Sequence, residues 1–298
     1  MLGFKRIYVL PATTSHCHGL GNDPKGLDRP VEKIGEPKVP SANQILERMA
    51  HRPWPLPQRP WRWSQGWQNL LFCHWAVTVQ SLRSYVPSCL EIDTKDGMAW
   101  VSAVAFHMAR VRPRGLPPLP PVSNFLELNL RTYVRLDDKP GVLFLSIHAG
   151  KRLAVQVAKW FSPLPYSYAR MDCSRGEGRY RFQCEAADPT DKLVFDARYR
   201  PESEVFAVGR SSLDEWLLER YCLYVGNRNG RLIRAEVHHD QWPVQDVEVE
   251  ITSNSLGRSF GLVLSPSPDR AHFSSGVNAL AWPFELLAAR QILAGSCQ

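Results

Sequence analysis

The stretch Phe125-Leu-Glu-Leu-Asn-Leu-Arg-Thr-Tyr-Val134 decides the fold class, because apolar and polar residues alternate along most of it. Successive side chains of a β-strand point to opposite faces, so this pattern predicts a strand with two unlike faces. One face is built mainly of leucine. The other carries a carboxylate, an amide, a guanidinium and a phenol, from Glu127, Asn129, Arg131 and Tyr133.

This polar face is the first candidate binding surface. A strand face that only meets water more typically repeats Lys, Glu and Thr, whereas these four groups can hold an anion or a carbonyl. We therefore predict that the face lines a small-molecule pocket, with an ordinary half-exposed strand as the alternative. In the next predicted strand, Ser146 and His148 share a parity with Phe144, so we expect them to extend the same wall.

Short β-prone runs separated by turns dominate the chain beyond residue 64. Turn sequences at 137–141 and 174–178 predict antiparallel hairpins. Helices are expected at 78–85, at 151–161 and after Ser212, and no βαβ alternation or glycine-rich phosphate loop supports a dinucleotide-binding architecture. The predicted fold class is α+β, mainly antiparallel β. The expected strands are 68–77, 99–111, 125–136, 141–148, 168–173, 178–185, 193–199, 221–225, 232–238 and 247–253.

The composition excludes several classes of protein. Of the 298 residues, 44% are hydrophobic and 22% charged, which supports a full core. No apolar run approaches the ~20 residues of a membrane span, so neither a transmembrane segment nor a membrane partner is expected. The net charge of +7 lies largely in the first 60 residues, and the nearly neutral body predicts no nucleic-acid partner. Seven cysteines without a Cys-x-x-Cys pair predict reduced thiols and a cytoplasmic location.

Proline and glycine content divides the chain near its start. Residues 1–42 predict a flexible, disordered leader, and residues 43–298 a single domain. Ser41 and Gln44 form a capping box that predicts a short helix. Residues 52–63, here called the Pro/Trp strap, predict an extended segment whose tryptophans pack on the chain itself. Recruitment of another protein by the strap is the alternative.

A second polar cluster surrounds two adjacent histidines. Glu236 and His238 share a strand face and can hydrogen bond into a pocket. His238 and His239 face opposite sides of a regular strand, so they cannot jointly chelate a metal. No metal site and no cofactor are therefore expected.

Several segments resemble the uncharacterised bacterial YqjF-like family over roughly residues 43–285. That family resembles acetoacetate decarboxylase in fold, which implies a closed or partly open antiparallel β-barrel around a central cavity, with a few helices outside. The segments that carry the resemblance are 51–57, 71–75, 86–93, 99–101, 125–133, 164–171, 219–224 and 236–239.

The resemblance also implies a test for one chemistry. Acetoacetate decarboxylases form a Schiff base on a lysine whose pKa is depressed by a second, adjacent lysine. The matching region is 153–163, where Lys159 is the sole candidate and its neighbours are Ala158 and Trp160. Gln68 stands where the decarboxylases have a substrate-binding arginine. These departures favour Lys159 as a solvated helix residue over a nucleophile.

Three functions follow from the sequence. The favoured one is a cytoplasmic protein, enzyme or not, whose pocket binds a small carboxylate or carbonyl compound, with Arg131 holding the oxyanion. The second is a Schiff-base decarboxylase or lyase that acts on a β-keto acid through Lys159. The third is an interaction platform that uses the Pro/Trp strap or the basic leader. The sequence leaves the oligomeric state open.

Overall fold

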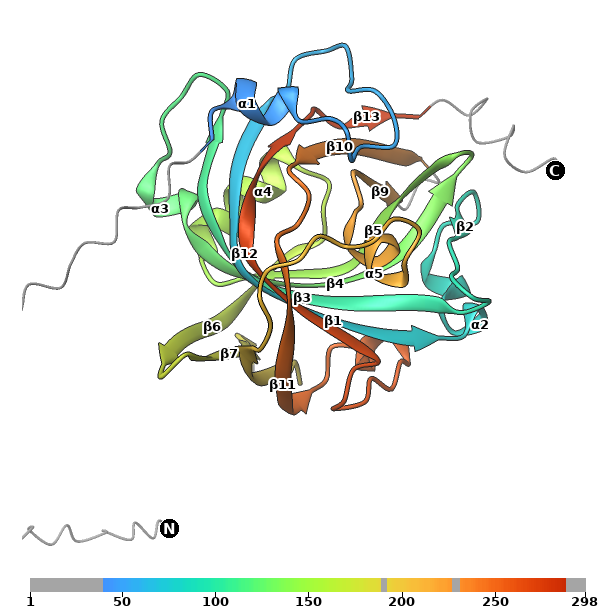
Figure 1. Cartoon of the computed structure of the whole chain (residues 1–298), viewed down its shortest axis with the longest axis vertical. Helices are drawn as coiled ribbons and strands as arrows, with labels where there is room; N and C mark the ends of the chain where they lie inside the picture. Colours follow the sequence, from blue (N-terminus) through green and yellow to red (C-terminus); the bar gives the residue numbers. More distant parts are fainter. Residues whose placement is uncertain (1–39, 189–191, 227–230, 288–298) are drawn as a thin grey trace, which may run out of the picture. The chain divides into compact units, whose positions relative to one another are not determined.

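The computed structural model describes residues 40–188, 192–226 and 231–287 of the chain (Figure 1). These residues fall in one compact unit. Most of the predicted leader, residues 1–39, lies outside the described residues. The helices are α1 (Ala42–Glu47), α2 (Val79–Leu82), α3 (Pro120–Ser123), α4 (Arg152–Phe161) and α5 (Leu213–Leu218), with short 3₁₀ turns at Arg83–Tyr85 and Arg258–Phe260.

The structure is mostly β, as the alternating sequence predicts. Thirteen strands of the described chain belong to one sheet. They are β1 (Trp63–Val77), β2 (Glu91–Ile92), β3 (Ala99–Pro113), β4 (Phe125–Leu136), β5 (Lys139–Ala149), β6 (Tyr166–Gly176), β7 (Arg179–Ala186), β8 (Val194–Pro201), β9 (Cys222–Gly226), β10 (Leu232–His239), β11 (Val244–Asn254), β12 (Arg270–Ala281) and β13 (Glu285–Leu286).

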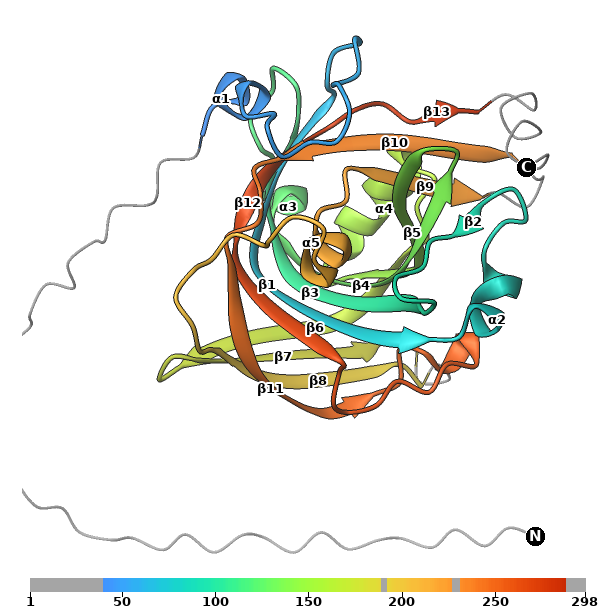
Figure 2. The same ribbon diagram turned by 45° about the vertical axis from the view of Figure 1, so that its right-hand side comes forward.

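Seven of these strands pair into a closed ring. The pairing runs β1–β3–β4–β5–β9–β10–β12 and returns to β1, because β12 pairs with both β1 and β10. In Figure 2, β9 and β10 lie across the ring from β1, β3 and β4, while β6, β7, β8 and β11 form a second layer below them. The strand ring therefore encloses space on one side of β4, and the second layer covers its other side.

Strand β4 separates two interiors. Leu128 and Leu130 are fully buried in a packed core with residues of β7 and β8, such as Phe182 and Phe195. The opposite face of β4 is also buried, since Glu127 and Asn129 are only 3% and 4% exposed. The alternative of a half-exposed strand is therefore wrong. The leucines of β4 face the apolar core, and its polar residues Glu127 and Asn129 face a second, polar interior.

The expected hairpins and caps are present. β4 and β5 pair from Leu136 and Lys139 outward, and β6 and β7 pair from Gly176 and Arg179 outward. The side chain of Ser41 accepts a hydrogen bond from the backbone N–H of Gln44, which completes the predicted capping box of α1. Local turn and cap chemistry is thus a reliable guide in this chain.

The parallel pairing of β5 was not expected. β5 pairs in parallel with β6, to which α4 connects it, and in parallel with β9. The described residues therefore include a β–helix–β crossover within a mainly antiparallel sheet. The crossover places α4 beside β5 and β6, where it contributes to the interior described below.

Strand β12 was missed by the sequence prediction, although it closes the ring. Its segment Ser274-Ser-Gly276 has low β propensity, which masks the strand in the sequence. Gly276 adopts φ +123°, and a Cβ there would lie 2.0 Å from the carbonyl oxygen of Trp67 on β1. The glycine lets two strands approach closely, which larger residues would prevent.

We expect Gly276→Ala to destabilise the protein by at least about 2 kcal/mol, because backbone must move to relieve the overlap. Chemical denaturation of the variant measures this free energy of unfolding. Gly178→Ala is the matched control, since Gly178 also has positive φ but no atom lies within 4 Å of its added Cβ. A cost at Gly276 no larger than at Gly178 would contradict close strand packing as the cause.

Candidate ligand-binding cavity

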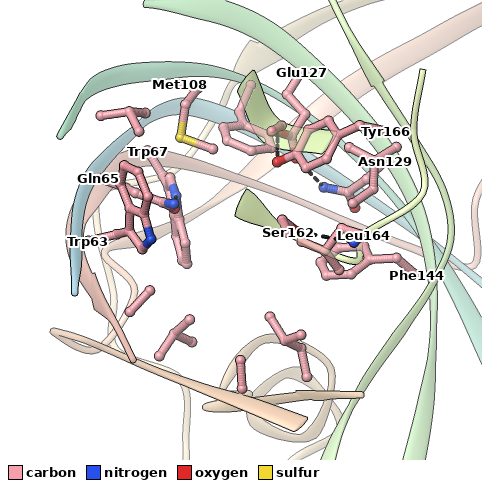
Figure 3. A pocket seen from close by; sticks show the side chains of 18 of the residues that line it. Trp63, Gln65, Trp67, Met108, Glu127, Asn129, Phe144, Ser162, Leu164 and Tyr166 are labelled. Carbon is pink, nitrogen blue, oxygen red and sulfur yellow. Dashed lines mark hydrogen bonds between the residues drawn. The ribbon is translucent and has the colours of Figure 1, made fainter. Parts of the chain in front are cut away.

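A cavity of about 410 Å³ lies inside the ring of strands. Most of its wall is apolar, with side chains such as Trp63, Trp67, Phe72 and Met108 from β1 and β3. Polar groups converge on part of the wall. Figure 3 shows Glu127, Asn129 and Tyr166 close together, across the cavity from Trp63, Gln65 and Trp67. A largely apolar pocket with a few converging polar groups is the usual form of a small-molecule site.

Glu127 is the acidic group of the cavity wall. Asn129 Nδ2 donates a hydrogen bond to its Oε1 at 3.2 Å, and the Tyr166 hydroxyl donates to its Oε2 at 3.1 Å. Burial raises the pKa of the Glu127 carboxyl to about 7, and the two hydrogen bonds oppose this rise. Glu127 therefore exchanges a proton near neutral pH, as an acid or base in the cavity must.

Arg131 follows Glu127 and Asn129 along the cavity side of β4. Its guanidinium lies over the ring of Phe72, with Cζ 5.8 Å from the ring centroid. The buried Nε and Nη2 atoms of Arg131 have no hydrogen-bond partner. Buried guanidinium N–H groups are normally satisfied, so their free state in a cavity wall indicates a place for an acceptor from a ligand.

Arg220 is a second guanidinium in the wall, and the sequence prediction missed it. Its Nη1 donates to Asp93 Oδ2 at 2.7 Å, and its Nε donates to the backbone oxygen of Trp216 at 2.7 Å. Its buried Nη2 has no partner. Asp93 and the end of α5 thus hold Arg220 in place while one N–H edge stays available.

Tyr133, the fourth residue of the predicted polar face, does not line the cavity. Its hydroxyl donates to the backbone oxygen of Leu217 at 2.9 Å and contacts Ser102 Oγ at 2.6 Å. The guanidinium of Arg220 lies over its ring, with Cζ 5.0 Å from the centroid. Tyr133 therefore supports Arg220 from behind instead of contacting a ligand.

The prediction that Ser146 and His148 extend the cavity wall is wrong. Leu130 pairs with Ser146 but Arg131 pairs with Phe144, so Leu145 is an extra residue that bulges from β5. The bulge reverses the parity of the strand, and Phe144 and Ile147 line the cavity instead. His148 contacts Ser167 Oγ on β6 at 2.7 Å.

Glu236 and His238 also lie outside the cavity wall. Glu236 accepts hydrogen bonds from Arg52 at 2.5 Å, Trp54 at 2.8 Å and Lys139 at 2.8 Å. His238 Nε2 lies 2.9 Å from the backbone oxygen of Ile45 in α1. Arg52 and Trp54 belong to the Pro/Trp strap, so their hydrogen bonds to Glu236 confirm that the strap packs on its own chain.

The opposite parity of β10 faces the cavity, through Ala235, Val237 and His239. Burial lowers the pKa of His239 to about 3, so its imidazole is neutral near pH 7. Both faces of β10 carry polar and apolar residues, so the sequence does not indicate which face points into the cavity. His239 was missed for this reason. Tyr166 was missed because it begins β6, outside the predicted strand.

Lys159 is exposed and is not part of the cavity wall. The side of α4 that faces the cavity carries Ala154, Val157, Ala158 and Phe161. Within the described residues, no lysine lines the cavity. No group of three or more metal-binding side chains occurs in this part of the chain. No described helix is long and apolar enough to cross a membrane.

The comparison with known families matches residues 64–278 to the model of DUF2071, described as an uncharacterized conserved protein. The chain is also 39% identical over 239 residues to the uncharacterized protein YqjF of Bacillus subtilis (strain 168). The alignment covers 80% of this chain and 98% of YqjF. The chain belongs to the DUF2071 family. This finding confirms the resemblance to YqjF-like proteins that the sequence motifs indicated.

Solved structures place this DUF2071 protein in the acetoacetate decarboxylase-like fold. The enduracididine biosynthesis enzyme MppR, complexed with pyruvate, matches with a TM-score of 0.55 at 14% identity over 80% of this chain and 94% of MppR. Acetoacetate decarboxylase from Legionella pneumophila matches with a TM-score of 0.54 at 11% identity, over 86% and 98%. An acetoacetate decarboxylase-like enzyme from Sphingomonas wittichii matches with 0.53 at 12%, over 77% and 94%.

We expect the buried carboxyl of Glu127 to make stability fall as pH rises. The unfolded protein releases this proton above pH ~4.5 and the folded protein only above pH ~7. The free energy of unfolding therefore falls between these two pH values and stays at the lower level above them. In Glu127→Gln this fall in the free energy of unfolding, on the order of 3 kcal/mol, should be absent because the amide does not titrate. Denaturation of both proteins at pH 5 and pH 8 measures it. A stability difference between variant and wild type that does not change with pH would contradict the raised pKa.

Proposed function

We propose that the cavity binds a small organic acid with an apolar body, and that Arg131 holds its carboxylate. The observation that carries the proposal is the pair of buried, unpartnered N–H groups of Arg131 in the cavity wall. A carboxylate accepts both hydrogen bonds in the planar geometry that a guanidinium offers. A neutral ligand would leave the charge of Arg131 uncompensated.

The balance of charge in the wall supports an anionic ligand. Arg220 is paired with Asp93 at 2.7 Å, and Glu127 is partly protonated near pH 7. Burial also lowers the pKa of His239, which leaves it neutral. Arg62 also lines the cavity but is exposed, so Arg131 is the more enclosed positive charge without a partner, and a counter-charge stabilises such a group.

The volume and the apolar lining of the cavity indicate what the rest of the ligand is like. The cavity volume of about 410 Å³ lies within the ~300–1,000 Å³ range of pockets that enclose small ligands. Aromatic and aliphatic side chains form most of its surface, so an apolar body of several carbons suits it better than a sugar or a phosphate ester. Asn129, Glu127 and Tyr166 can hydrogen bond a carbonyl or hydroxyl group of the ligand.

A comparison of similar folds gives further support for an acid. MppR, which has a similar fold, was solved in complex with pyruvate, a small keto acid. A protonated Glu127 can donate a hydrogen bond to a ligand carbonyl, and an ionised Glu127 can remove a proton from the neighbouring carbon. The cavity therefore has the groups for proton transfer on a bound acid, in addition to those for binding.

Schiff-base chemistry is not the function that the cavity favours. Formation of an imine needs a lysine amine that reaches the ligand, and the described wall of the cavity contains none. Lys159 lies exposed on α4, whose alanine and valine residues face the cavity. The alternative of a partner bound by the Pro/Trp strap loses its support, because Trp54 and Trp61 are occupied within the chain.

We expect Arg131→Met to weaken binding of octanoate about 10-fold to 100-fold while binding of octanol stays unchanged, because only the acid uses the guanidinium. Isothermal titration calorimetry measures both affinities. Arg135→Met is the matched control, since Arg135 lies four residues along β4 and pairs with Glu91 at the surface. Octanoate serves as a probe that carries both a carboxylate and an apolar body. An equal loss of affinity for octanoate and octanol in Arg131→Met would contradict an anion site at Arg131.

The same substitution should leave the ligand-free protein as stable as wild type or more stable. Arg131→Met removes a half-buried guanidinium whose Nε and Nη2 atoms are buried without a partner, and a methionine side chain packs well against the ring of Phe72. Thermal unfolding without ligand measures this. A large fall in the melting temperature of Arg131→Met would show that the guanidinium serves the fold and not a ligand.

Borohydride reduction in the presence of pyruvate or acetoacetate should leave no adduct on Lys159. Mass spectrometry of the intact chain and its peptides detects such an adduct. Because the amine is exposed and outside the wall, reduction should label Lys159 no more than other exposed lysines, such as Lys192. Stoichiometric labelling of Lys159 would restore the Schiff-base hypothesis.

A further inference from the structure

Exposed apolar side chains gather beside the cavity on α4 and on the segment that leads into α3. Trp160 is 78% exposed, Leu119 61%, Leu116 58%, Leu153 54% and Phe161 53%. α3 packs against α4, so the two segments are neighbours. We call these five residues and the helices that carry them the α3–α4 face. Exposed apolar side chains grouped on neighbouring segments are typical of a place where a protein meets a partner or a membrane.

The α3–α4 face is also strongly cationic. Residues 109–126 and 150–171 contain no aspartate or glutamate. Arg114, Lys151, Arg152 and Lys159 are exposed there. None of these four forms an ion pair with another described residue. The face therefore presents uncompensated positive charges next to exposed apolar groups.

The sequence of α4 arranges these two properties as stripes. Leu153 and Trp160 are both exposed and are spaced i and i+7, so they share one line along the helix, and Val157 between them is half-buried and reaches the cavity wall. Arg152, Gln156 and Lys159 repeat this spacing one residue earlier and form a polar line beside it, while Ala154 and Ala158 face the cavity. A basic stripe beside a stripe with Trp and Leu is the pattern of helices that lie in a membrane interface.

We propose that the α3–α4 face docks on an anionic lipid surface. Charge decides between the occupants of this face. A second copy of the chain would bring the same cationic groups against each other around a two-fold axis, whereas anionic headgroups compensate them. The lack of a described spanning helix does not bear on this proposal, because an interfacial helix lies on the membrane and does not cross it.

Docking would place the entrance of the cavity at the lipid surface. Leu119 and Phe161 belong both to the exposed face and to the wall of the cavity, so the two adjoin. An amphiphilic acid dissolved in the lipid would reach the cavity without passing through water. This consequence rests on the proposed function, while the docking itself does not.

The test uses the full chain and vesicles of phosphatidylcholine, with and without phosphatidylglycerol. Co-sedimentation should show binding to the anionic vesicles, weaker binding as salt rises, and none to phosphatidylcholine alone. Trp160→Ser and Arg152→Glu should each weaken binding about tenfold, through the apolar and the charged stripe respectively. Neither residue lines the cavity, so octanoate affinity should stay at the wild-type value.

Two variants serve as matched controls. Val263 is 98% exposed and Arg258 is exposed in the same loop after β11. Val263→Ser and Arg258→Glu repeat the two changes away from α4 and should leave vesicle binding unchanged. Absence of vesicle binding, or binding equal in the wild type, Trp160→Ser and Arg152→Glu, would overturn the proposal. So would self-association that buries the face, seen in analytical ultracentrifugation and abolished by Trp160→Ser. The octanoate titration of the same proteins tests the proposed function separately.

Discussion

Burial of both faces of β4 is the constraint on which the rest of the structure depends. Leu128 and Leu130 fill a dry core, while Glu127 and Asn129 are buried on the other side. Polar groups can stay buried only where hydrogen bonds or a ligand satisfy them. The ring of strands must therefore enclose a space with its own polar chemistry, and the closure through β12 provides that space. A single sheet with a wet face would need neither the closure nor the cavity.

Inside this space the polar groups differ in how completely they are satisfied. Glu127 has two donors, and Arg220 has Asp93 and a backbone oxygen. Arg131 lies over the ring of Phe72, and its buried Nε and Nη2 atoms have no hydrogen-bond partner. Part of the hydrogen-bonding capacity in the wall thus serves to position groups, while Nε and Nη2 of Arg131, Nη2 of Arg220 and Oδ1 of Asn129 have no hydrogen-bond partner. The difference between satisfied and unsatisfied groups, more than their number, defines the candidate site.

The sequence predicted those parts of the structure that depend on local rules. Alternation located β4 and its polar face, and turn and cap residues located hairpins and helix starts. Where a feature depends on distant contacts, prediction failed. The bulge at Leu145 reverses the parity of β5 and removes Ser146 and His148 from the wall. Arg220 gains its position only through Asp93, 127 residues away in the chain, and no local pattern reveals that pair.

The two parities of β4 also bear on how proteins with this fold could diverge. A change at Leu128 or Leu130 disturbs packing against the second layer, and a change at Asn129 or Arg131 alters the chemistry of the cavity. The residues of β4 that line the cavity can then vary with the ligand, while those that face the second layer preserve the scaffold. Because β4 lies between the core and the cavity, ligand specificity can change in this fold while the packing of the core is kept.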